Sequence, residues 1–162
     1  MLRRLVALLA ALAGPAAAAD LPPIDVYMPN VCLACIDWTE HLRQNGFTVR
    51  VTRTDDMDAV KRRLKVPKDL EAVPSARIAG YFVEGHVHAD QIKELLAEKP
   101  AALGLAVPGL PLGAPGRENS NPTCETACTV LDKDSAGQRM RREFYETLLV
   151  LKNGQTKTWA RH

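Results

Sequence analysis

Hydrophobic and polar residues alternate along this chain with two different periods, and its first ordered block shows both. Ile24–Tyr27 is a short apolar run, and residues 47–52 alternate between apolar and polar side chains, as strands do. Between them, Leu33–Asn45 carries apolar residues at helical spacing and is followed by Gly46, a typical helix-ending residue. This block therefore predicts a strand, a helix and a strand, which together have the length of a βαβ unit.

A second helix, a hairpin and a third helix are predicted next. Acidic residues at 55–58 can cap a helix that runs through Leu64, and Pro67 is expected to end it. Residues 72–85 form two short strand-like runs around a tight turn, and Ala89–Glu98 again has helical spacing. This order of elements predicts an α/β fold of the thioredoxin-like class, with a central mixed sheet flanked by helices.

The C-terminal third is expected to contain a loop, a polar insertion and a last hairpin. Prolines and glycines recur throughout residues 104–116, so this stretch is interpreted as an ordered apolar loop without regular structure. Residues from about 117 to 142 are polar and are interpreted as an insertion. Residues 145–151 and 156–160 predict two strands, joined through the turn signal Asn153-Gly154.

The N-terminus has the three parts of a signal peptide. Met1–Arg4 is basic, Leu5–Gly14 is apolar, and Ala17–Ala19 offers small residues for cleavage. Because the apolar run is shorter than the ~20 residues that a membrane-spanning helix needs, we expect export with no stable membrane span after cleavage. Residues 1–19 would then be removed, and residues 20–162 are long enough for a single domain with its own core.

Composition narrows the classes of function. The formal net charge of +2 is accounted for by Arg3 and Arg4 of the leader, so the rest of the chain is electrically balanced and has no basic stripe for a nucleic-acid partner. With 46% hydrophobic residues the chain can build a core without disulfides. Its four cysteines, in two close pairs within an oxidising compartment, are therefore candidates for function.

Cys32 and Cys35 stand at the start of the first predicted helix, directly after Pro29-Asn30. A helix start has unpaired N–H groups and partial positive charge, which favour a thiolate over a thiol. Such a pair can exchange disulfides, with Cys32 as nucleophile and Cys35 as resolving thiol, or it can hold a soft metal ion. A purely structural disulfide is the remaining alternative.

Pro74 comes directly before the third predicted strand. Thioredoxin and glutaredoxin folds place a cis-proline at this point, facing the two cysteines. The order of the elements therefore predicts a cis bond before Pro74 and a place for this residue in a catalytic site. An ordinary trans proline at the beginning of a strand is the alternative.

Cys124 and Cys128 lie four positions apart in the insertion. They can form a second metal-binding pair, join the first pair in a four-cysteine site, or form a local disulfide.

Met28 and His86 are two weaker candidate ligands. Met28 is close in sequence to Cys32 and can offer a thioether, although a methionine there also suits core packing. His86 and His88 would point to the same side only if the strand before them continued through both. Histidines at strand ends are usually solvated, which is the alternative for His86.

Taken together, these motifs resemble those of the CopG-like family of copper-resistance proteins. The resemblance covers roughly residues 24–116 and resumes in the last hairpin. It implies a thioredoxin-like fold, a periplasmic location and copper bound by cysteine sulfur. The matching segments are Cys32–Cys35, Trp38–Leu42 with Gly46-Phe47, Gly80–Val87, Gly104–Gly109 and Gly113–Gly116.

The chain also departs from the pattern of that family. Family members usually carry Cys-x-Cys-Cys, whereas this chain has Ala34 at the third position. They carry Ser-Cys-His where it has Ala72-Val73-Pro74, and methionines where it has Leu110 and Arg117. These differences remove sulfur and imidazole groups that select Cu(I). What they leave is a two-cysteine site opposite a proline, which is closer to the arrangement in a glutaredoxin.

Two functions are consistent with these residues. The first is a periplasmic copper-handling protein that holds Cu(I) between Cys32 and Cys35 and gives it to, or takes it from, a partner protein. The second is an enzyme, a periplasmic thiol-disulfide oxidoreductase that uses Cys32, Cys35 and Pro74 and can act on cysteines of a copper protein.

Overall fold

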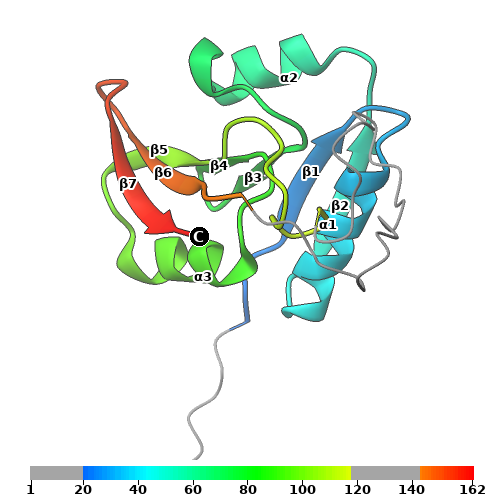
Figure 1. Ribbon diagram of the computed structural model, residues 1–162, viewed down its shortest axis with the longest axis horizontal. Coiled ribbons are helices and arrows are strands. Elements are labelled where there is room, and N and C mark those ends of the chain that lie inside the picture. The colour runs from blue at the N-terminus through cyan, green and yellow to red at the C-terminus, as the bar shows by residue number, and fades with distance from the viewer. Residues whose placement is uncertain (1–19, 118–142) are drawn as a thin grey trace, which may run out of the picture.

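The computed structural model describes residues 20–117 and 143–162. The predicted signal peptide, and the greater part of the insertion with Cys124 and Cys128, lie outside the described residues. Within these, one seven-stranded sheet has the order β2-β1-β3-β4-β5-β6-β7 and is flanked by helices (Figure 1), so the predicted α/β class with a mixed sheet is confirmed. The elements are β1 (Ile24–Met28), α1 (Leu33–Gln44), β2 (Val49–Arg53), α2 (Met57–Leu64), a 3₁₀ turn (Lys68–Leu70), β3 (Ser75–Ile78), β4 (Tyr81–Glu84), α3 (Ala89–Glu98), β5 (Ala102–Ala106), β6 (Glu146–Leu151) and β7 (Thr156–Arg161).

The register of the sheet determines which loops lie side by side. β1 pairs with β2, and β4 with β5, in parallel, whereas the other neighbours are antiparallel. Tyr27, near the end of β1, pairs with Ser75 at the start of β3. The chain leaves β1 towards Cys32 and enters β3 from Pro74, so these two connections lie at the same end of the sheet.

Local signals explain where the first two helices begin and end. Cys32 is the N-cap of α1, and Gly46, with φ of +90°, follows its C-cap. Asp56 caps α2 by accepting a hydrogen bond from the backbone N–H of Ala59. The helix then ends at Leu64, because Lys65 adopts a left-handed conformation; Pro67 was expected to end it, but lies two residues further on.

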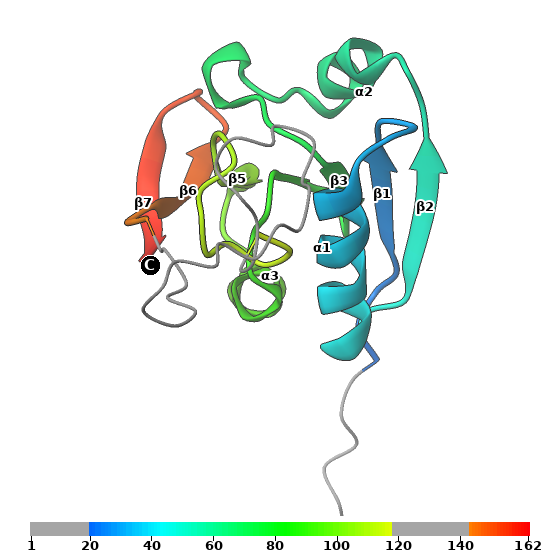
Figure 2. The same ribbon diagram turned by 45° about the vertical axis from the view of Figure 1, so that its right-hand side comes forward.

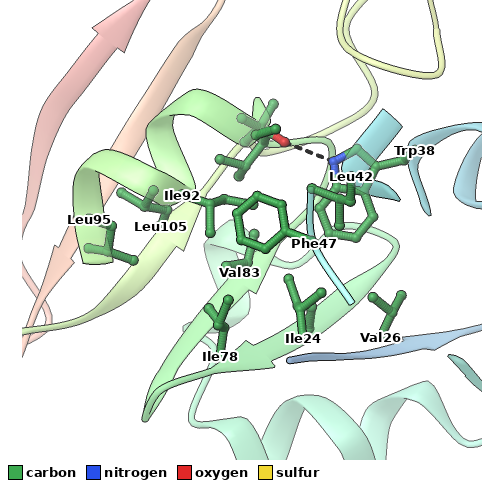
Figure 3. Packing of buried hydrophobic residues seen from close by; sticks show 14 of the residues in the cluster. Ile24, Val26, Trp38, Leu42, Phe47, Ile78, Val83, Ile92, Leu95 and Leu105 are labelled. Carbon is green, nitrogen blue, oxygen red and sulfur yellow. Dashed lines mark hydrogen bonds between the residues drawn. The ribbon is translucent and has the colours of Figure 1, made fainter. Parts of the chain in front are cut away.

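Two hydrophobic clusters cover the two faces of the sheet. On one face, α1 and α3 lie side by side (Figure 2), and their buried residues pack against alternate residues of the strands (Figure 3). In this cluster the indole N–H of Trp38 donates to the carbonyl oxygen of Val87 at 2.8 Å. On the other face, Val66 and Leu70 pack with Phe82 of β4. No helix among the described residues is long and apolar enough to cross a membrane.

The expectation that residues 104–116 contain no regular structure was wrong for the first three of them. Gly104 lies in β5, where a Cβ atom at this position would come within 2.0 Å of the carbonyl oxygen of Phe82 on β4. Leu105, the next residue, is fully buried in the core. The glycine thus permits close approach of two strands instead of marking a turn, and the prolines begin only at Pro108.

Candidate functional site

The two cysteines lie where the loop after β1 becomes helix α1, as the sequence predicts. They form a disulfide with their Cα atoms 5.3 Å apart. The sulfur of Cys32 also accepts a hydrogen bond from the backbone N–H of Cys35 at 3.3 Å. Cys35 is fully buried, whereas Cys32 is half-buried. Cys32 is therefore the sulfur that a partner can reach, and the helix N-terminus favours its thiolate form once the disulfide is reduced.

Large apolar side chains surround Cys32 on the outside of the molecule. Val31 is 75% exposed and Leu33 is 48% exposed, and Ile36 on the next turn is also exposed. Neighbouring solvent-exposed apolar side chains are costly to leave in water and often mark a contact surface for another protein. The accessible sulfur is thus set in a surface that suits transient protein contact.

Pro74 lies at the same end of the sheet as the two cysteines. The Val73–Pro74 peptide bond is cis, as predicted, and the Pro74 carbonyl oxygen accepts a hydrogen bond from the backbone N–H of Gly85 at 2.8 Å. Tyr27 of β1 pairs with Ser75 of the antiparallel strand β3. Met28, the residue after Tyr27, therefore lies opposite Pro74, the residue before Ser75. Met28 is only 2% exposed, so its thioether belongs to the buried wall of this region.

His86 is fully buried between two loops. Its Nδ1 atom lies 2.6 Å from the carbonyl oxygen of Pro115. Its Nε2 atom has no hydrogen-bonding partner of acceptable geometry among the described residues, although the carbonyl of Val73 is close enough to affect the ring. Burial lowers the pKa of His86 to about 4, and the hydrogen bond to Pro115 only partly offsets this effect. The side chain is therefore neutral at neutral pH.

The loop after Pro111 lies directly against the first turns of α1. A Cβ atom at Gly116 would come within 2.7 Å of the backbone nitrogen of Trp38 and 2.8 Å of the carbonyl oxygen of Ala34. Ala34 stands between the two cysteines. His86 thus connects the Val73–Pro74 segment on one side with the loop that supports the cysteine-bearing helix on the other.

A buried ion pair borders this region, and no sequence pattern predicts it. Lys61 of α2 pairs with Glu84 of β4, and both also bind the backbone of Ala72. Burial raises the pKa of Glu84, while the hydrogen bond from Lys61 acts against this rise. No local sequence pattern links these two side chains, because the two residues are 23 positions apart and meet only in the fold.

His88 and His162 lie in a cluster with Tyr145. β4 ends at Glu84, so the strand does not continue through both His86 and His88. His88 bonds instead to the hydroxyl of Tyr145 at 2.8 Å, and its ring stacks on that of His162 with the centroids 4.5 Å apart. Among residues 20–117 and 143–162, no group of three or more His, Cys, Asp or Glu side chains is arranged to hold a metal ion. A ligand role for Met28 or His86 remains a prediction, and Cys124 and Cys128 lie outside the described residues.

Comparison with known proteins identifies the family. Two solved structures, both of copper resistance protein CopG (forms 1 and 2), are each 34% identical to this chain, with a TM-score of 0.71. Each alignment covers 88% of this chain and 98% of the other. This chain belongs to the CopG copper-resistance family. Membership of the CopG family confirms the resemblance found in the sequence and supports a function connected with copper.

A family model described as a protein of unknown function, DUF411, matches residues 71–117. This segment of the CopG-family chain contains Pro74, Glu84, His86 and Pro115, which surround or support the region beside the disulfide. No curated protein matches the chain.

Proposed function

We propose that this CopG-family chain is an exported, periplasmic copper-handling protein that binds Cu(I) through Cys32 and Cys35 and exchanges it with a partner protein. The observation that supports the proposal most directly is the adjacent cysteine pair at the start of α1, in a chain whose structural relatives are copper-resistance proteins. Thiolates are soft ligands that suit Cu(I). Copper is cargo here, held by few ligands so that it can be handed on.

The disulfide prevents copper binding by these two sulfurs, since neither is a thiolate in that state. A reductant such as a dithiol must first supply two electrons and two protons, which breaks the S–S bond and gives two thiols. Each thiol then loses its proton as its sulfur binds copper. The half-buried Cys32 would meet the incoming metal first, and Cys35 would complete a two-coordinate site; Met28 and His86 are the proposed additional donors.

Titration of the processed chain with Cu(I), under anaerobic conditions and followed by native mass spectrometry, tests this proposal. The reduced protein is expected to bind Cu(I) tightly, and the oxidised protein is expected to bind none at Cys32 and Cys35. Cys32→Ser should abolish the tight site, whereas the control Cys124→Ser/Cys128→Ser should retain it. Equally tight Cu(I) binding by the wild type and by Cys32→Ser would contradict the proposal.

The second candidate function is that of a thiol-disulfide oxidoreductase of the thioredoxin-like class. The Cys32–Cys35 disulfide, with Pro74 at the same end of the sheet, supports it. The Cys32 thiolate would attack a partner's disulfide and form a mixed disulfide. Cys35 would then attack Cys32, which releases the partner as a dithiol and leaves the Cys32–Cys35 disulfide.

This second function is tested by supplying reduced glutathione as the reductant and a disulfide-containing protein such as insulin as the substrate. Multiple turnovers that require Cys32, in a protein that binds no Cu(I) tightly, would favour the oxidoreductase function over copper handling. Tight Cu(I) binding without turnover would leave the copper-handling function as the better one.

A further inference from the structure

The Lys61–Glu84 ion pair binds both the carbonyl oxygen and the N–H of one backbone residue, Ala72. The two side chains are 6% and 0% exposed. The Lys61 ammonium donates to the carbonyl oxygen of Ala72, and Glu84 Oε1 accepts the backbone N–H of Ala72 at 2.7 Å. Both hydrogen-bonding groups of the Ala72 backbone are therefore occupied by one buried pair of charges.

A pair of this kind is poorly explained by stability alone. Moving two charges out of water is costly, and apolar residues of similar volume often replace a buried ion pair without loss of stability. Side-chain packing also leaves this segment open on one side, because Ala72 and Val73 line a hollow of about 490 Å³ that Lys61 and Arg117 border. What the pair supplies is a fixed position for the backbone at Ala72.

That position lies next to the candidate site. Ala72 is two residues before Pro74, whose carbonyl oxygen binds the N–H of Gly85, the residue after Glu84. A Cβ atom at Gly85 would come within 3.2 Å of the Ala72 side chain and 2.2 Å of the Val107 carbonyl oxygen, so the two segments lie in close contact. Movement at Ala72 would therefore be passed to the Val73–Pro74 segment.

We propose that the Lys61–Glu84 pair is a positioning device for the Val73–Pro74 segment, and that it thereby sets the reactivity of the Cys32–Cys35 pair. The inference deepens the proposed function and rests on it for the copper measurement only. With the pair removed, the segment would lose its fixed position at the end of the sheet where the cysteines lie, and on this proposal it would admit water to Cys35, which is fully buried. Thiolates are charged and gain more from water than a disulfide does, so reduction of the disulfide becomes more favourable.

The test replaces both charges with apolar side chains, in Lys61→Met/Glu84→Leu. Its matched control is Arg161→Met/Glu146→Leu, which removes an exposed ion pair on β6 and β7. Equilibration with glutathione measures the Cys32–Cys35 disulfide, thermal unfolding measures stability, and competition with a chromophoric chelator measures Cu(I) affinity. The control is expected to match the wild type in all three.

For the Lys61→Met/Glu84→Leu variant we expect a melting temperature close to that of the wild type. Its equilibrium with glutathione should shift about tenfold towards the dithiol, which is about 30 mV for a two-electron couple, and its Cu(I) affinity should change with it. A folded variant whose glutathione equilibrium equals that of the wild type overturns the inference.

Two further results keep the test decisive. If the double variant does not fold, Glu84→Gln replaces it, because glutamine keeps the size but lacks the charge that holds Lys61 against Ala72; a smaller shift in the same direction supports the inference, and none overturns it. If the wild type binds no Cu(I), the proposed copper function fails, whereas the glutathione equilibrium still decides the role of the pair.

Discussion

The Nδ1 atom of His86 lies 2.6 Å from the carbonyl oxygen of Pro115. A carbonyl oxygen can only accept, so Nδ1 carries the proton and Nε2 of the neutral ring holds a lone pair. The contact joins the loop after β4 to the loop that packs against the first turns of α1. His86 is therefore a buried, neutral connection between the segments that surround the cysteine pair.

Protonation of His86 is expected to destabilise the apoprotein in mild acid. Its pKa is about 4 in the folded state, because burial disfavours the charged ring, against 6.5 for an ordinary histidine. As the pH falls from 6.5 to 4, the unfolded chain binds a proton that the folded chain does not. The low folded-state pKa of His86 therefore stabilises the folded chain fully above pH 6.5. This contribution to the free energy of unfolding, about 3 kcal/mol at most, should be lost as the pH falls to 4.

Urea unfolding of the wild type and of His86→Asn, at several pH values in this range, measures the effect. Asparagine can place an amide N–H near the position of Nδ1 but does not titrate. The difference in unfolding free energy between the two proteins should therefore shrink as the pH falls. A difference that stays constant between pH 6.5 and 4.5 would contradict the expectation.

Gly116→Ala should destabilise the protein more than its backbone conformation alone requires. Gly116 has φ of +80°, where any side chain is strained by about 1 kcal/mol or more. An added Cβ would also meet the backbone of α1 at 2.7 Å, which cannot yield without moving the start of the helix. We expect a loss of roughly 2–4 kcal/mol and a change in the reactivity of Cys32.

The control for this variant is Gly46→Ala. Gly46 has φ of +90°, but nothing lies within 4 Å of an added Cβ, so this substitution reports the conformational strain alone. Chemical unfolding and the rate of alkylation of the reduced cysteines measure both effects. If the two variants lose equal stability, the loop at Gly116 does not press on α1.

Lys61→Met alone should cost far more stability than the double apolar variant. It leaves the Glu84 carboxylate buried without its cation, and breaking one partner of a buried pair typically costs about 3–5 kcal/mol. Burial already raises the pKa of Glu84. A raised carboxyl pKa gives stability at low pH that is lost as the pH rises, so the loss in Lys61→Met should be smaller at pH 5 than at pH 8. Urea unfolding at the two pH values checks this, and an equal loss at both would contradict it.

Local signals were sufficient for most of the elements. The bounds of α3 match the predicted Ala89–Glu98, because its apolar spacing is undisturbed by glycine or proline. The position of the cysteines at a helix start and the cis bond before Pro74 could also be predicted, since both depend on the order of neighbouring elements. The last hairpin formed where Asn153-Gly154 indicated, with Gly154 at φ of +82°.

Other features depend on contacts between distant residues and have no local pattern. Lys61 and Glu84 are 23 positions apart, and only the fold brings them together at the backbone of Ala72. The burial of His86 follows from the path of the Pro115 loop, 29 residues further along the chain. Gly104 was wrongly interpreted as part of a loop for the same reason. A glycine is required there because the neighbouring strand β4 lies too close for a Cβ atom.

The second cysteine pair is expected to act separately from the first. Cys32 and Cys35 are bonded to each other, and Cys35 is fully buried, so neither sulfur depends on Cys124 or Cys128 in the oxidised protein. A shared metal site would require one of the distant cysteines within a bond length of about 2.3 Å from a metal held at Cys32. Peptide mapping of the oxidised protein should therefore find the Cys32–Cys35 disulfide and no bond between the two pairs.

The double variant Cys124→Ser/Cys128→Ser extends this test to copper. Because the first pair supplies both of its own thiolates, we expect the variant to keep the wild-type Cu(I) affinity at that pair. Native mass spectrometry should show either unchanged stoichiometry, if the second pair binds no metal, or the loss of one equivalent, if it is a site of its own. A drop in the affinity of the first site itself would instead show that sulfurs from both pairs hold one ion, and would overturn the separation proposed here.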